Sequence, residues 1–277
     1  MRKLTYGAAI REAHKHLLAT DPRVFLIGQG LWSPWYAGGS LDSIEKEFGK
    51  DRVIDSPISE NAVTGMAVGA AIAGMRPIVF HPRMDFLALA CDALVNQASN
   101  WNSLFGTSVP LTVRAVINRG GEQGPQHSQS LHSWFLHTPG WKVVMPSTPA
   151  DAMGLLIAAV QDPSPVMYID DRWLYAVEGP VPDEPTATPI GQAATTHVGQ
   201  DVTIIANSWM SHQALQAAAE LDGERAQVDG LERVGLAALH RAADIGRGRE
   251  LALGQAVDAV VLDDVHDRHV AADEVAE

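Results

Sequence analysis

Short apolar runs alternate with longer stretches of helical periodicity through the first 170 residues of the chain. Uninterrupted apolar runs are typical of strands that a parallel sheet buries on both faces. The alternation of such strands with helices predicts an α/β fold, in which a largely parallel sheet lies between two layers of helices. The expected strands are residues 24–27, 52–54, 77–80, 111–117, 141–144 and 166–169, and the expected helices are residues 5–18, 43–48, 61–74, 85–104 and 150–161.

The pattern changes after residue 170. Residues 171–201 contain several prolines and show little periodicity, which is typical of an extended linker. Further along, residues 202–277 contain two apolar runs on either side of a helical stretch. We therefore expect a first domain at residues 1–170 and a second, smaller α/β domain at residues 202–277.

Composition limits the classes of partner. The chain has 33 acidic and 20 basic side chains and a formal charge of −13, which argues against binding to nucleic acid or to an anionic membrane. The only cysteine, Cys91, lies in an expected helix and cannot form an internal disulfide. The segment Met1–Tyr6 lacks the apolar stretch of a signal peptide, and the apolar run Ala62–Met75 is too short to span a bilayer. We expect a cytoplasmic protein that acts on a small molecule.

One candidate for chemistry is the start of the helix expected at residues 61–74. Ser59 is a predicted N-cap, and Glu60 lies in the first turn, where the helix dipole favours an acidic side chain. Gly65 and Gly69 give this helix a face of small residues, although glycine costs about 1 kcal/mol at an interior helical position. Such a face indicates close approach of a partner helix or a ligand, and the Glu60 carboxylate would then be poorly hydrated and suited to proton transfer. The simpler alternative is a capped helix with one favourable acidic residue.

A second candidate is His127, which follows the glycine-rich loop at residues 118–126. The loop comes directly after an expected strand, so it lies at the carboxyl edge of the sheet, where α/β proteins bind ligands. This setting favours an imidazole that faces a substrate, and the alternative is a histidine that caps or packs against a helix. The loop lacks the Gly-Lys-Ser/Thr ending of a phosphate-binding P-loop.

Five stretches within the first 170 residues of the chain form an ordered series. In this order and approximate spacing they resemble the β subunit of the thiamine-diphosphate-dependent E1 component of 2-oxo-acid dehydrogenases. Apolar runs in the second domain are similar to the same family over shorter lengths. The stretches are Arg52–Glu60, Gly65–Ala71, Gly74–Ile78, Gln126–Gln129 and Pro139–Pro146.

The resemblance implies a pyrimidine-binding domain followed by a short C-terminal domain, and it implies roles for several residues. Glu60 stands at the position of the glutamate that hydrogen-bonds the aminopyrimidine ring of the cofactor and exchanges a proton with it. Phe86 matches the aromatic residue that packs on the pyrimidine, and Gln29 and Ile58 are expected beside the cofactor. His127 corresponds to the histidine that stabilises charge or transfers a proton near the 2-oxo acid.

Two departures from the family pattern concern this site. Gln29 stands where the family often has an acidic residue. The segment before Phe86 is more basic than usual, and its Arg83 is expected either to recognise a carboxylate or phosphate of the substrate or to form a structural ion pair.

The chain contains no Gly-Asp-Gly followed at a distance by Asn-Asn, the diphosphate and magnesium motif of thiamine enzymes. The resemblance therefore implies an α subunit that supplies the Mg²⁺ ligands, and an α₂β₂ heterotetramer, or a β₂ dimer without the α subunit. The expected activity is decarboxylation of a 2-oxo acid and transfer of the acyl or aldehyde unit to an acceptor. The alternatives are a split transketolase or carboligase subunit and a non-catalytic assembly subunit.

Overall fold

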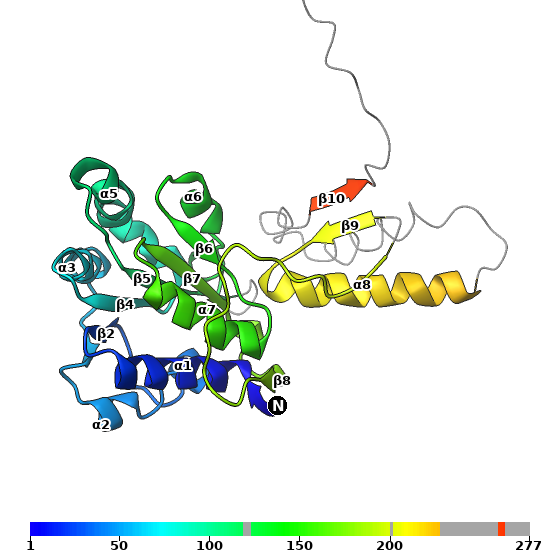
Figure 1. Cartoon of the computed structure of the whole chain (residues 1–277), viewed down its shortest axis with the longest axis horizontal. Coiled ribbons are helices and arrows are strands. Elements are labelled where there is room, and N and C mark those ends of the chain that lie inside the picture. The colour runs from blue at the N-terminus through cyan, green and yellow to red at the C-terminus, as the bar shows by residue number, and fades with distance from the viewer. Residues whose placement is uncertain (119–122, 200–201, 228–259, 264–277) are drawn as a thin grey trace, which may run out of the picture. The chain divides into compact units, whose positions relative to one another are not determined.

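The computed structural model describes residues 1–118, 123–199, 202–227 and 260–263 (Figure 1). The chain divides into two compact units, Met1–Ala193 and Ala194–Glu277. All of the residues that the sequence assigns to the site belong to the first unit. Among the described residues, no helix is both long enough and apolar enough to cross a membrane.

The first unit is built around a parallel sheet of six strands, which confirms the predicted fold class. Two neighbouring strands of this sheet, Thr112–Ile117 and Val166–Asp171, have six residues each, and all of these residues are buried. This is expected for strands that are covered on both faces. In spatial order the strands are β3 (Val53–Asp55), β2 (Val24–Gly28), β4 (Arg76–His81), β5 (Thr112–Ile117), β7 (Val166–Asp171) and β6 (Lys142–Val144).

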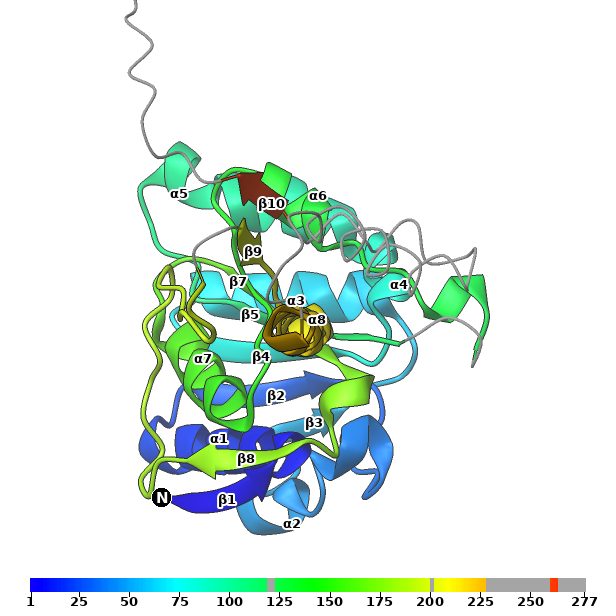
Figure 2. The same ribbon diagram turned by 90° about the vertical axis from the view of Figure 1, so that its right-hand side faces the viewer.

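Helices cover both faces of this sheet (Figure 2). One face carries α1 (Tyr6–Thr20), α2 (Ile44–Phe48) and α7 (Pro149–Gln161), and α1 packs against α7. The other face carries α3 (Glu60–Ile72) and α6 (His132–His137). A core of valine, alanine, leucine and isoleucine side chains joins α3 to the sheet and to the helices that follow β4.

The helix expected at residues 85–104 is continuous but irregular. It begins as α4 (Met84–Leu87), passes through the 3₁₀ segment η2 (Ala88–Ala90) and the π-helical segment η3 (Asp92–Ala98), and ends as α5 (Ser99–Phe105). Side chains of the last segment bond to backbone carbonyl groups of the preceding turn, which loosens the regular ladder. Periodicity alone predicts a helix here but not this change of pitch.

The region predicted to be a linker contains two ordered elements of the first unit. They are the short helix η5 (Arg172–Leu174) and the strand β8 (Glu178–Val181). β8 pairs antiparallel with β1 (Arg2–Thr5), a strand that the sequence pattern did not predict. Pro180 is accommodated because this is a two-stranded sheet, in which each strand keeps a free edge.

The second unit contains the expected secondary structure. Its described part consists of β9 (Val202–Ile205), α8 (Ser208–Gln227) and β10 (Val260–Asp263). The two strands pair antiparallel. The domain boundaries proposed from the sequence stay predictions.

A fully buried ion pair joins two neighbouring inner strands of the sheet. Arg114 of β5 donates to both carboxylate oxygens of Asp170 on β7, at 3.1 and 2.7 Å, and neither side chain is exposed. Tyr175 donates a further hydrogen bond of 2.6 Å to Asp170. Burial acts to lower the pKa of Arg114, but the charge of Asp170 outweighs this effect and the pKa is raised. The guanidinium therefore stays charged and depends on its partner.

We expect Asp170→Asn to lower the free energy of unfolding by about 3–5 kcal/mol, because the change leaves the Arg114 charge buried without compensation. Lys142→Gln is the matched control, because Lys142 is 44% exposed in its 2.5 Å pair with Asp162. That loss should stay within about 1 kcal/mol. Urea unfolding of both variants tests the difference, and equal losses would contradict it.

Candidate functional site

The candidate site lies at the carboxyl edge of the parallel sheet. From β2 the chain moves to β3 on one side and then to β4 on the other side, so the direction of winding reverses between β2 and β4. Ligands of open α/β sheets bind at such a reversal, outside the carboxyl ends of the strands. The segments that follow β2, β3, β4 and β5 carry the residues that the sequence singled out.

Gln29 and Glu60 form a hydrogen-bonded pair at this edge. Gln29 follows β2, and its Nε2 donates to Oε1 of Glu60 at 3.0 Å. Glu60 is the first residue of α3 and is only 7% exposed, so the carboxylate is poorly hydrated as expected. Ser59 occupies the N-cap position, but its side chain accepts no hydrogen bond from the helix. Gln29 and the helix dipole therefore stabilise the Glu60 carboxylate, whereas the Ser59 side chain does not cap the helix.

His81 lies near Glu60, and no role was predicted for it from the sequence. It is the last residue of β4 and is 2% exposed, and its Nε2 is 3.1 Å from Oγ1 of Thr64 on α3. Burial lowers the pKa of His81 to about 4, although the nearby Glu60 charge acts to raise it. The imidazole is therefore neutral at pH 7. Its position at the carboxyl end of a strand was the signal available in the sequence.

Phe86 and His127 form the second pair. Phe86 lies in α4, and His127 ends η4 (Pro125–His127), a single 3₁₀ turn. Their rings meet edge to face, with centroids 5.2 Å apart and an interplanar angle of 87°. Oδ1 of Asp85 accepts the backbone N–H of Gln129 at 3.1 Å, which ties α4 to the loop that carries His127. The structure thus brings together two residues that are 41 positions apart, since 127 − 86 = 41.

Other sequence expectations have different outcomes. Ile58 is 82% exposed, so its expected contact with a cofactor stays a prediction. Two further histidines of α6 differ in exposure: His132 is buried and His137 is exposed. Cys91 is half-buried, and partial burial raises the pKa of its thiol. Within the described part of the chain, no group of three or more His, Cys, Asp or Glu side chains could hold a metal ion.

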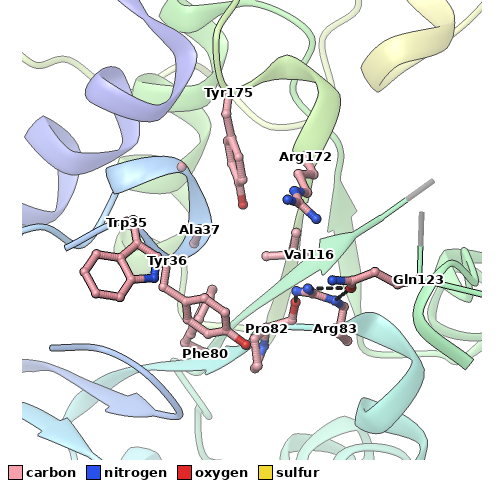
Figure 3. Close-up of a pocket in the computed structure, with 11 residues that line it drawn as sticks. Trp35, Tyr36, Ala37, Phe80, Pro82, Arg83, Val116, Gln123, Arg172 and Tyr175 are labelled. Atoms are coloured by element: carbon pink, nitrogen blue, oxygen red, sulfur yellow. Dashed lines mark hydrogen bonds between the residues drawn. The ribbon is translucent and has the colours of Figure 1, made fainter. Parts of the chain in front are cut away.

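A cavity of about 280 Å³ opens at the same edge of the sheet (Figure 3). Side chains that follow or end β4, β5 and β7 form part of its lining, and the loop after β2 supplies the rest. Of the residues that line the cavity, only Arg83 was predicted from the sequence as a candidate substrate contact. The lining residues are Trp35, Tyr36, Ala37, Gly38, Phe80, Pro82, Arg83, Val116, Gln123, Arg172 and Tyr175.

These features define a parallel α/β domain with a buried carboxylate at its topological switch point, the arrangement of a cofactor-binding domain. Residues 2–176 match the family described as "Transketolase, pyrimidine binding domain". The chain belongs to this family, as a member similar to the E1 β subunits of pyruvate, 2-oxo-acid and acetoin dehydrogenases.

Named relatives are similar over most of the chain. The β subunit of acetoin:2,6-dichlorophenolindophenol oxidoreductase from Cupriavidus necator is 39% identical over 234 residues, which cover 80% of this chain and 69% of that protein. The β subunit of 2-oxoisovalerate dehydrogenase from Bacillus subtilis is 37% identical and covers 84% of this chain and 73% of its own. A solved structure described as "Split gene transketolase, inactive beta4 tetramer" aligns with a TM-score of 0.57 at 16% identity, over 80% of this chain and 68% of that one. At that identity the likeness concerns the fold alone.

The low pKa of His81 predicts a specific loss of stability in acid. The unfolded chain takes up a proton near pH 6.5 and the folded chain only near pH 4, so the free energy of unfolding should fall as the pH drops between these values. His81→Gln keeps a polar group near Thr64 and removes this titration. Its unfolding free energy should therefore depend less steeply on pH than that of the parent between pH 4 and 6.5. Parallel slopes in urea titrations of the two proteins would exclude the assignment.

Proposed function

We propose that the chain is the β subunit of a heteromeric thiamine-diphosphate enzyme, which decarboxylates a 2-oxo acid and transfers the acyl or aldehyde unit to an acceptor. The observation that carries the proposal is the Gln29–Glu60 pair, a nearly buried carboxylate at the switch point of the sheet. Support comes from the relatives, whose names describe β subunits of acetoin and 2-oxo-acid oxidoreductases. The identity of the acid stays open.

The residues at the site suit the pyrimidine part of the cofactor. A carboxylate can accept a hydrogen bond from a protonated ring nitrogen or exchange the proton with it, and Glu60 offers one in a poorly hydrated place. The half-buried ring of Phe86 offers an aromatic surface for packing. Thiamine diphosphate, when bound, supplies the nucleophilic carbon that adds to a 2-oxo acid and accepts the electron pair left by decarboxylation.

Each residue of this chain then has a distinct task. Gln29 holds the Glu60 carboxylate in place through its amide N–H. Glu60 takes up and returns the proton at the pyrimidine ring. His127, held against Phe86, stabilises charge or moves a proton beside the 2-oxo acid.

We place the Mg²⁺ and diphosphate ligands on an α subunit. The sequence lacks the motif for them, and the described residues contain no candidate metal cluster. We further propose an α₂β₂ heterotetramer in the cytoplasm. The face of α3 that carries Gly65, Met66 and Gly69 is exposed in the single chain, so a partner helix can pack closely against it.

The role of Glu60 is tested in the complex with the α subunit, cofactor and Mg²⁺. Glu60→Gln keeps the shape of the side chain but cannot exchange the proton, and loss of general acid–base assistance typically slows a reaction about 10²–10⁴-fold. Deuterium exchange at the thiazolium C2 of the bound cofactor should slow by this order, even without substrate. His127→Ala is the contrasting variant, which should retain that exchange and slow only turnover of the 2-oxo acid. Equal exchange in the parent and the Glu60→Gln complex would falsify the role.

A parallel screen of 2-oxo acids with a dye acceptor and with aldehydes separates the dehydrogenase from a carboligase.

The assembly is tested by Gly69→Leu. A Cβ at Gly69 meets nothing within 4 Å, so leucine should leave the separate chain unchanged or stabilise it by up to about 1 kcal/mol through better helix propensity. In the assembled protein the same side chain should overpack the contact and cost about 1–3 kcal/mol. Sedimentation and thermal melting of the separate chain and of the assembled protein measure these two opposite effects. Gly199→Leu, at another open position, is the control and should affect neither form. Unchanged assembly of Gly69→Leu would place the interface elsewhere.

A further inference from the structure

The cavity at the carboxyl edge is lined by two arginines and several aromatic rings. Figure 3 shows Arg83 and Arg172 on one side of the cavity and the Tyr36 ring on the other. Its volume, about 280 Å³, is at the small end of the range for ligand pockets. The cavity therefore suits a small group or one end of a small molecule.

Hydrogen-bond donors converge on a single neutral oxygen in this lining. Oε1 of Gln123 accepts from Nε and Nη2 of Arg83, at 2.8 and 2.7 Å, and from Nδ2 of Asn118 at 3.0 Å. An amide oxygen has two lone pairs, so three N–H donors exceed its capacity. The other described acceptor of the Arg83 guanidinium is also neutral, the Pro82 carbonyl oxygen. The place where these donors meet suits an oxygen that carries negative charge.

The second arginine joins the same network. Nη1 of Arg172 donates to Oδ1 of Asn118 at 3.4 Å, so Asn118 and Gln123 connect the two guanidinium groups through neutral amides. Arginine binds carboxylate and phosphate with two parallel hydrogen bonds, and such charge-assisted bonds are about twice as strong as neutral ones. A ligand oxyanion would be a better acceptor here than the Gln123 amide.

The walls of the cavity depend on positions without a Cβ. A Cβ at Gly38 would overlap the ring of Tyr175, and one at Gly30 would overlap the ring of Tyr36. Both glycines have positive φ, 63° and 70°. The hydroxyl of Tyr175 is fixed by Asp170. These aromatic walls are therefore held in place by the fold.

The cavity is also connected to the candidate catalytic residues along the chain. Arg83 precedes α4, which carries Phe86, and Gln123 precedes η4, which carries His127. The Arg83–Gln123 hydrogen bonds thus join the two segments that position the aromatic pair. A group bound at Arg83 would lie beside the segments that hold the proposed reaction site.

We propose that this cavity binds an oxyanion, the carboxylate or phosphate at the end of a substrate remote from its reacting carbon, and that Arg83 is the specificity-determining residue. The enzyme would then act on an anionic substrate or acceptor rather than on a plain aliphatic one. The link to the reaction rests on the proposed function, whereas the anion site rests on the cavity itself.

Turnover in the assembled complex tests the link to the reaction. One pair of substrates is 2-oxoglutarate and 5-methyl-2-oxohexanoate, in which an uncharged branch replaces the distal carboxylate. The other is glyceraldehyde 3-phosphate and glyceraldehyde as acceptors, which identifies phosphate as the preferred group. The parent should prefer the anionic member of one pair about tenfold or more in kcat/KM, and Arg83→Gln should abolish that preference. Arg23→Gln, in an exposed pair with Asp21 that precedes β2, is the matched control and should keep it.

Calorimetry on the full chain tests the anion site without any reaction. Inorganic phosphate and succinate are the probes, and Arg83→Gln should weaken binding of one of them about tenfold or more while Arg83→Lys retains part of it. Circular dichroism confirms that each variant is folded. Binding that depends on Arg83, without turnover of any 2-oxo acid, would support the anion site and overturn the proposed function. Turnover with neither anion preference nor anion binding in the parent would overturn the anion site alone.

Discussion

The parallel pairing of β2 with β3 on one side and β4 on the other determines where the chemistry of this chain can lie. All strands of a parallel sheet have their carboxyl ends at the same edge. The segments that follow these strands therefore bring residues from distant parts of the sequence together there. Gly28 lies opposite Asp55 of β3 and Phe80 of β4. This register places Gln29 beside the start of α3 and allows its bond to Glu60. A shift of one residue would reverse the side chains of the strand and separate the pair.

The neighbouring strands β5 and β7 supply the other half of this edge. Their register is stabilised by the Arg114–Asp170 ion pair, which also holds Tyr175. A buried pair adds little net stability compared with apolar packing, but it tolerates few alternative arrangements. We infer that its contribution here is alignment, because the residues that follow these strands, Asn118 and Arg172, belong to the network of the cavity.

Much of the first unit could be predicted because its signals are local. Apolar runs marked each strand of the central sheet, and Gly28 and Asp55 marked the ends of two strands. The β1–β8 pair could not be predicted in this way. Its strands are four residues long and pair across residues 2 and 181, so neither carries a periodic signal and only the closed fold brings them together.

The same distinction applies to the site. Glu60 and His127 could be identified because each follows a local marker, a helix start or a glycine-rich loop. Their partners depend on long-range contacts: Gln29 is 31 positions from Glu60, and Phe86 is 41 positions from His127. For Arg83 the sequence left two roles open. Among the described residues its guanidinium donates to the Gln123 amide oxygen and the Pro82 carbonyl oxygen, which is the basis of the proposed anion site.

Side chains around the start of α3 differ strongly in their exposure. Glu60 is 7% exposed, whereas Ile58, two residues earlier, is 82% exposed, and Met66 on the outer face of the helix is 58% exposed. The carboxylate is thus buried by its own chain on one side, while apolar residues beside it face outward. This arrangement fits the proposed function, in which the chain would supply the proton-exchanging group and a second subunit would cover the remaining surface.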